Sequence, residues 1–198
     1  MSPLARHLRL VASWVGIGIG VPMLLRAELG VAPFDVLNTG ISTALGWSLG
    51  VCFIVDAVAF YAIGRLLGAR LGWACLGGTV VIGPMVNLFL GVIPHQTAVP
   101  ARVGMFAGGI AVIALAICLV ITTELGAGPS EVFMLGLIAR GMGIVPARWI
   151  SDGAPLVIGA LLGGSLGPGT LVFALCMGPL VKYGLRKMHY EPAHRASA

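Results

Sequence analysis

The seven acidic residues are the side chains of this sequence best suited to chemistry, and six of them form three pairs. A self-comparison at a shift of 96 residues places each acid of the first half on an acid of the second half. Ionisable side chains in apolar segments are costly and are usually functional, so the six acids are candidate substrate- or ion-binding residues. The pairs are Glu28 with Glu124, Asp35 with Glu131, and Asp56 with Asp152.

The chain that carries these acids is strongly apolar in composition. Its 198 residues are 58% hydrophobic and only 10% charged, and the mean hydropathy is +1.02. A soluble domain carries roughly 25% charged residues, so this inventory cannot supply a water-facing shell. The apolar content excludes a disordered chain, and the absence of a dense Lys/Arg patch argues against nucleic acid as a partner. The sequence predicts an all-α polytopic membrane protein, with the lipid bilayer as its first partner.

Six segments have the roughly 20 mostly apolar residues that a bilayer crossing needs. They are 8–26, 48–67, 71–93, 103–123, 147–165 and 168–185. The stretches 33–46 and 129–143 are shorter and more polar. They predict half-helices that are re-entrant or buried in protein, where irregular backbone at membrane depth is tolerated.

The basic residues predict the orientation of the chain. If the two short stretches do not cross, all of the 12 Lys and Arg residues except Arg26 and Arg102 share one side. The positive-inside rule then favours six spans with both termini in the cytoplasm, in a bacterial inner membrane. If the short stretches do cross, Arg65 and Arg70 move outside and the preference weakens. The eight-span alternative stays open.

The acid pairs belong to an internal duplication. The stretch 28–36 (ELGVAPFDV) aligns with 124–132 (ELGAGPSEV), and a shift of 95 places Gly83-Pro84 on Gly178-Pro179. Several motifs therefore match in the same order along the chain.

We interpret residues 1–96 and 97–198 as two membrane repeats of one integrated domain. Each repeat has a long helix, a turn with a half-helix, and two further helices. Three spans per repeat is an odd number, so the second repeat would insert upside down relative to the first. Inverted repeats with interrupted helices are the recurrent plan of secondary transporters, which bind substrate near the membrane midplane.

Two of the acid pairs also have structural explanations. Asp35 and Glu131 each follow a proline in the first turn of a short helix, where a carboxylate complements the helix dipole. Glu28 and Glu124 end long helices, where a carboxylate faces the unfavourable end of the dipole. A loop acid held by backbone amides is the structural alternative for this second pair, and a functional role is slightly favoured.

Asp56 is the acid that local sequence explains least. Its helical neighbours are apolar and offer no cation, so its carboxyl group must be protonated, paired across helices or exposed to water. Asp152 differs because Arg148 lies four residues earlier on the same helical face. Asn38 heads a polar patch with Thr39, Ser42 and Thr43 in the first half-helix, and this patch is a candidate cavity lining.

Enzymatic and metal chemistry find little support in the sequence. The four cysteines have no CxxC spacing, and the four histidines lie in tails or loops. The GxSxG pattern at 163–167 lacks the strand-turn-helix context and the histidine partner of a hydrolase. We therefore expect no catalytic residues, no metal site and no cofactor. The Gly-x-x-x-Gly pairs Gly16/Gly20 and Gly104/Gly108 predict close helix packing within the fold, with a homodimer seam as the alternative.

The stretch ELGVAPFDVLNTGIS resembles the signature of the YczE/YyaS/YitT family of small bacterial membrane proteins. The matching positions are Gly30, Pro33, Phe34, Asp35, Val36, Leu37, Gly40 and Ile41. The resemblance covers most of the chain. It implies a small integral membrane fold and a transport-like role.

These observations predict a small secondary-type transporter, a permease or an exporter. The acid-rich interior favours a small cationic or zwitterionic solute, with proton coupling through the acids. We expect this solute between the half-helices that begin at Pro33 and Pro129. The alternative is a membrane partner that does not transport, such as a substrate-binding subunit of a larger complex.

Overall fold

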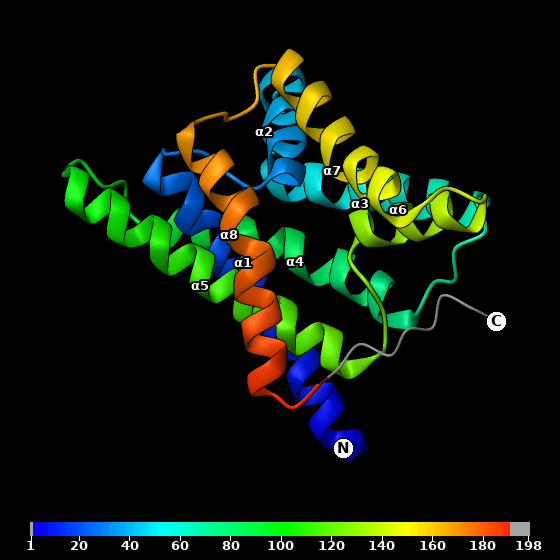
Figure 1. Ribbon diagram of the computed structural model, residues 1–198. Helices are drawn as coiled ribbons and strands as arrows, with labels where there is room; N and C mark the ends of the chain where they lie inside the picture. Colours follow the sequence, from blue (N-terminus) through cyan, green and yellow to red (C-terminus); the bar gives the residue numbers. More distant parts are fainter. Residues whose placement is uncertain (1, 191–198) are drawn as a thin grey trace.

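The computed structural model describes residues 2–190, without the side chains of Ile144, Val145 and Arg148. Within this range the chain forms eight helices and no strand (Figure 1). The helices are α1 (Pro3–Ala27), α2 (Pro33–Leu45), α3 (Leu49–Leu66), α4 (Trp73–Val92), α5 (Val99–Thr123), α6 (Pro129–Ala139), α7 (Ile144–Leu161) and α8 (Pro168–Lys187). The all-helical fold and the two short helices agree with the sequence prediction.

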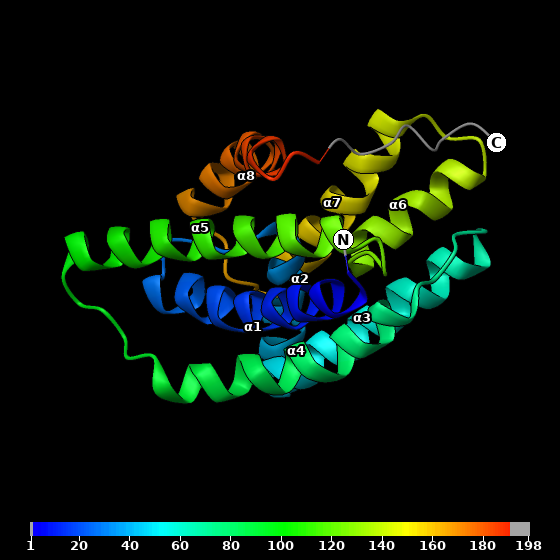
Figure 2. The ribbon, with the colours of Figure 1, turned by 90° about the horizontal axis from the view of Figure 1, so that it is seen from below.

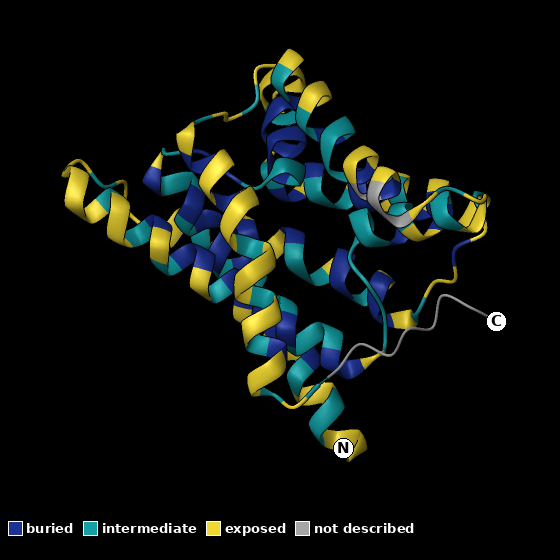
Figure 3. Cartoon of the chain, in the orientation of Figure 1, coloured by how far each residue is buried: buried dark blue, intermediate teal, exposed yellow. Residues whose placement is uncertain are grey.

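Five of the helices are long and apolar enough to cross a membrane, namely α1, α3, α4, α5 and α8. The apolar helical stretches Pro129–Ala139 and Trp149–Leu161 are shorter. Many large apolar side chains are exposed, and Figure 3 colours much of the outer faces of the long helices as exposed. Val80, Leu171 and Leu175 are about two-thirds exposed, at 68%, 65% and 66%. The chain is therefore a multi-pass membrane protein whose outer faces suit lipid.

Prolines and left-handed residues set the helix ends. Pro33, Pro129 and Pro168 each occupy a first helical position, where the missing N–H costs nothing. At the C-terminal ends of α1 and α5 the left-handed residues are Glu28 (φ 52°) and Glu124 (φ 55°). Non-glycine residues rarely adopt this conformation. The two glutamates therefore lie at backbone positions that glycine ordinarily fills, and nearby arginines help to hold them there, as described below.

The helices pack as two bundles (Figures 1 and 2). In the long-helix bundle, α1 and α5 lie side by side, α4 packs on α1, and α8 packs on α5. In the half-helix bundle, α2 packs on α7 and α3 packs on α6. The contact between α3 and α4 joins the two bundles.

Helices α1 and α5 run antiparallel and approach closely at small residues. Arg6 at the start of α1 contacts Thr123 at the end of α5, and Arg102 at the start of α5 contacts Ala27 at the end of α1. A Cβ added at Gly16 would lie 2.9 Å from the Ala116 Cβ. The first Gly-x-x-x-Gly pair therefore packs within the fold, as predicted.

The second Gly-x-x-x-Gly pair is only partly used inside the chain. A Cβ added at Gly108 would lie 3.0 Å from the Met23 Cε, whereas nothing described lies within 4 Å of one added at Gly104. The predicted homodimer seam stays a prediction at this surface.

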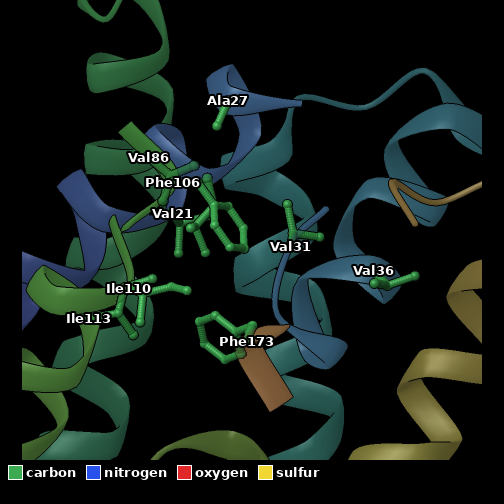
Figure 4. Close-up of a cluster of buried hydrophobic side chains, with 10 residues drawn as sticks. Val21, Ala27, Val31, Val36, Val86, Phe106, Ile110, Ile113 and Phe173 are labelled. Atoms are coloured by element: carbon green, nitrogen blue, oxygen red, sulfur yellow. The ribbon is translucent and has the colours of Figure 1, made fainter. Parts of the chain in front are cut away.

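The main apolar core lies where α1 and α5 meet the linker to α2 (Figure 4). Val31 in this linker points into the core, and its N–H donates to the Thr170 hydroxyl of α8 at 3.2 Å. The core thus fixes the point from which α2 leaves the long-helix bundle. Its buried members are Val21, Leu24, Ala27, Val31, Val36, Val86, Phe106, Ile110, Ile113 and Phe173.

Candidate functional site

Asp56 lies near the middle of α3, inside the half-helix bundle, and is only 4% exposed. Neither carboxylate oxygen has a hydrogen-bond partner among the described residues. A buried carboxylate without donors is expensive unless it is neutral or matched by a cation. Asp56 therefore requires a proton or a cation that the described part of the chain does not supply.

The first two turns of α2 place Asp35 and Asn38 beside Asp56. Asp35 is 5% exposed and Asn38 is fully buried. Asp56 interacts electrostatically with Asp35, and the Asn38 amide lies close enough to influence the Asp56 carboxylate without a bond of normal geometry. The Asn38 amide instead donates to the Phe34 carbonyl at 3.4 Å. The structure thus brings together three of the seven predicted site residues.

The oxygen atoms of this cluster are all of one chemical kind. Both Asp56 oxygens and the Asn38 Oδ1 are buried acceptors without a described donor. An ionised carboxylate and an amide oxygen only accept hydrogen bonds, so two such groups cannot satisfy each other through these atoms. We call Asp35, Asn38 and Asp56 the acceptor cluster.

Glu131 lies in the first turn of α6, and Tyr61 of α3 interacts electrostatically with both Glu131 and Asp56. Glu131 is half-buried, and the Ser130 hydroxyl donates to its Oε2 at 3.2 Å. The start of α6 therefore approaches α3, the helix that carries Asp56, at Tyr61.

Aromatic rings connect the two half-helices through α3. Phe60 makes edge-to-face contacts with Phe34 of α2 and Phe133 of α6, at centroid distances of 5.2 and 5.3 Å. The N-terminal turns of both half-helices thus flank the middle of α3. Helix N-termini carry partial positive charge, which favours the carboxylates of Asp35 and Glu131 at these positions.

Sequence reasoning missed the polar side chains around Tyr61. The Tyr61 hydroxyl donates to the Ala127 carbonyl at 3.3 Å, and the Cys75 thiol donates to the same carbonyl at 3.2 Å. Thr79 of α4 interacts with Tyr61 as well. A tyrosine inside a predicted span was the available signal for this group, because its hydroxyl needs a partner in an apolar setting.

Glu28 and Glu124 lie elsewhere, at opposite ends of the antiparallel α1–α5 pair. At one end the Arg102 guanidinium donates to the carbonyls of Ala27 (2.8 Å) and Glu28 (2.6 Å). It also lies 3.6 Å from the Glu28 carboxylate, which His95 contacts at 3.2 Å. We call this arrangement the Glu28 clamp.

The other end repeats the same arrangement, which we call the Glu124 clamp. Arg6 donates to the Thr123 carbonyl at 2.9 Å and lies 3.5 Å from the Glu124 carboxylate. The Tyr190 hydroxyl donates to Glu124 at 3.0 Å, and burial together with this carboxylate raises the pKa of Tyr190. Arg6 and Arg102 are related by the same 96-residue shift as the acids. The structure thus pairs both glutamates with arginines and separates them from the acceptor cluster.

Asp152 is half-buried on α7 and has an interaction partner. Its predicted pair with Arg148 lies outside the described side chains. No three His, Cys, Asp or Glu side chains gather as metal ligands in the part of the chain that the structure describes.

Residues 4–186 match the family described as "Family of unknown function (DUF6198)". An uncharacterized protein of Haemophilus influenzae is 29% identical, over 85% of this chain and 78% of that protein. The uncharacterized membrane protein YczE of Bacillus subtilis is 23% identical, over 94% of this chain and 90% of YczE. No solved structure matches. The resemblance drawn from the sequence is confirmed, and the chain belongs to this YczE-like DUF6198 family.

Proposed function

We propose that the protein is a small secondary-type transporter, a permease or an exporter, for a small cationic or zwitterionic solute. Asp56 is the proposed proton- or cation-responsive group. The observation that carries this proposal is the acceptor cluster, in which both Asp56 carboxylate oxygens and the Asn38 Oδ1 are buried without a hydrogen-bond partner among the described residues. An ammonium group or a proton supplies the missing positive charge, whereas an anion would add to the repulsion.

A positive solute also suits the aromatic surroundings of the cluster. Phe34, Phe60 and Phe133 lie half-buried around the N-terminal turns of both half-helices. Aromatic faces attract ammonium groups, most strongly where water is excluded. A solute with both a positive charge and a small apolar body therefore fits this region better than a hydrated inorganic ion.

Paired contacts support two inverted repeats as the basis of transport. Gly64 of α3 packs on the Val132 backbone of α6, and the corresponding Gly159 of α7 packs on the Val36 backbone of α2. The corresponding helices α1 and α5 run antiparallel, which is the relation that an upside-down second repeat requires. In this arrangement each half-helix packs on a helix of the other repeat.

The proposed orientation in the bacterial inner membrane follows from the same arrangement. With both termini in the cytoplasm, the Glu124 clamp faces inward and the Glu28 clamp faces outward. The linkers that follow the clamps return into the membrane, so the N-terminal turns of α2 and α6 reach the middle of α3. Irregular backbone at that depth is acceptable because it is buried in protein.

Flux in proteoliposomes tests the proposed function. The assay records uptake of methylammonium, choline and lysine, each with and without an imposed proton gradient. We expect flux of at least one of these probes. Asp56→Asn should reduce this flux by more than about tenfold, because the amide keeps the shape of the side chain but removes its ionisable group. Asp56→Glu is the matched variant, since it keeps the acid and should retain part of the flux. Unchanged flux in the folded Asp56→Asn protein would contradict the role of Asp56.

Accessibility labelling tests the proposed orientation separately. Single cysteines replace Arg70, in the loop between α3 and α4, and Thr97, in the loop between α4 and α5. Exposed Cys176 is replaced by alanine, and the other three cysteines are buried. With six crossings, a membrane-impermeant thiol reagent reaches only position 97 from outside the cell. If the two short stretches cross instead, position 70 is outside and position 97 inside, so labelling of position 70 but not of position 97 from outside would overturn the inverted arrangement.

A further inference from the structure

The two halves differ in how their last two helices pack. In the first half, α3 packs closely on α4. In the second half, no comparable contact joins α7 and α8 among the described residues, and both views show these helices apart (Figures 1 and 2). The connecting loops, 67–72 and 162–167, have the same length, so the difference lies in the spread of the helices.

The α3–α4 contact is built from glycine and one asparagine. A Cβ added at Gly83 would lie 2.5 Å from the Gly50 carbonyl oxygen, so the two backbones touch. The Asn87 amide oxygen accepts the Gly50 N–H at 2.8 Å, and its amide nitrogen donates to the Ser48 hydroxyl at 3.2 Å. This contact closes the start of α3 against the second half of α4.

The corresponding positions in the second half are chemically different. Pro146 stands at the position of Gly50, Lys182 at that of Asn87, and Gly178 at that of Gly83. Proline has no N–H to donate and lysine has no acceptor, so this pair cannot form the Asn87 hydrogen bond. Gly83 is buried, whereas Gly178 is exposed with no described atom within 4 Å of an added Cβ. Among the described residues, the second half therefore lacks both the hydrogen bond and the close backbone approach that hold α3 against α4.

We propose that these two places are the gates of alternating access. The α3–α4 contact is the outer gate, closed in this structure, and the α7–α8 separation is the inner gate, open in this structure. The two gates exchange states as the half-helix bundle moves against the long-helix bundle. This inference rests on the proposed transport function and adds which side is open at rest and which residues decide it.

The position of Asp56 connects the outer gate to the acceptor cluster. Asp56 lies on α3 less than two turns after Gly50, so opening the α3–α4 contact shifts the backbone that carries the carboxylate. In inverted-repeat transporters, motion of one bundle around a fixed site exposes that site to alternate sides. If the gates work in this way, the cluster is reached from the inner side while the outer gate is closed.

Spin-label distance measurements on the full chain test this proposal. One labelled pair replaces Trp47 and Leu88, which flank the outer gate, and a second pair replaces the equivalent Gly143 and Tyr183 at the inner gate. Cys176 is replaced by alanine in both proteins. We expect one short distance for the outer pair. For the inner pair we expect a longer and broader distribution.

Two sets of substitutions should each favour the state in which the outer gate is open and the inner gate is closed. One set changes the outer gate and the other changes the inner gate. Asn87→Leu removes the hydrogen bonds of the outer gate, and Pro146→Gly with Lys182→Asn supplies those bonds to the inner gate. Each set should lengthen the outer distance and shorten the inner one. The second set leaves the outer gate intact, so it remains informative if Asn87→Leu fails to fold.

The outcomes separate this inference from the proposed function. Opposite shifts in the two distances support the gates even if no tested probe is transported. Suppose that flux depends on Asp56 but that neither set of substitutions changes either distance in the folded protein. This result overturns the gates and leaves the transport proposal standing. A change in only one of the two distances also overturns the exchange.

Discussion

The acceptor cluster and the two clamps differ in what surrounds their acids, although all of these acids belong to the pairs that the 96-residue shift relates in sequence. Glu28 and Glu124 have side chains that are 54% and 62% exposed, and each has an arginine from the other half. Asp56 is 4% exposed and has no described donor. We interpret the two glutamates, which have arginine partners, as structural acids. Asp56 is the acid that we propose for a cation or proton from outside the protein.

The largest effect is expected for Asp56→Leu, which should abolish transport without lowering the stability of the fold. Asp56→Leu removes two buried acceptors without partners, so we expect the free energy of unfolding to stay level or rise by about 1–2 kcal/mol. Flux of the transported probe should be lost completely. Thermal unfolding in detergent and proteoliposome flux measure the two effects. A strongly destabilised Asp56→Leu protein would show that the carboxylate is structural, like those of the clamps.

A second prediction concerns the arginine of the Glu28 clamp. Arg102→Ala leaves the carbonyls of Ala27 and Glu28 without their donor, and we expect a loss of about 1–3 kcal/mol in stability. Arg102→Lys is the matched variant, because one ammonium keeps the charge but not the two-carbonyl geometry. Thermal unfolding should rank wild type above Arg102→Lys and Arg102→Lys above Arg102→Ala. Equal stability of all three proteins would remove the clamp as a structural element.

A smaller effect is expected at the carboxylate of the Glu124 clamp. Glu124→Gln removes an exposed ion pair, and such pairs contribute less than about 1 kcal/mol. We expect flux to persist in this variant, in contrast to Asp56→Asn. The flux assay therefore decides between the structural and the functional interpretation of Glu124. A tenfold loss of flux in Glu124→Gln would return this residue to the binding site.

The smallest predicted effect is a titration shift at Tyr190. Burial and the neighbouring Glu124 both raise the pKa of this phenol, because each disfavours the phenolate. Glu124→Gln should therefore lower the pKa of Tyr190 toward its ordinary value. Ultraviolet titration of phenolate absorbance measures the shift, and the Tyr190→Phe protein identifies which signal belongs to this residue. An unchanged titration would show that Tyr190 does not contact Glu124 in solution.

The sequence predicted the helices well because their signals are local. Proline at a helix start and glycine after a run of apolar residues act within one or two turns. The predicted half-helix 33–46 therefore became α2, at Pro33–Leu45, and the predicted span 48–67 became α3, at Leu49–Leu66. The end of α6 was predicted too late in the chain, since the predicted stretch 129–143 is helical only to Ala139.

The partners of the acids were beyond the reach of sequence reasoning. No basic residue lies near Glu124 in the chain, and Arg6, its partner, is 118 residues away. The shift that pairs the acids also pairs Arg6 with Arg102, but only the antiparallel packing of α1 and α5 brings each arginine to the opposite glutamate. The exposed and paired state of Glu28 and Glu124 is a tertiary property.

The sequence by itself determined that this is a helical membrane protein with few charges and with acids at matching positions of two halves. Composition and periodicity suffice for that, because lipid leaves a chain few structural options. Only the tertiary structure decided which acids are compensated. Asp56 and Glu124 look alike as lone acids in an apolar sequence, yet the field at a carboxylate depends on charges and donors that arrive from distant segments. Packing supplied a cation and a hydrogen-bond donor to Glu124, and among the described residues it supplied neither a cation nor a hydrogen bond of normal geometry to Asp56.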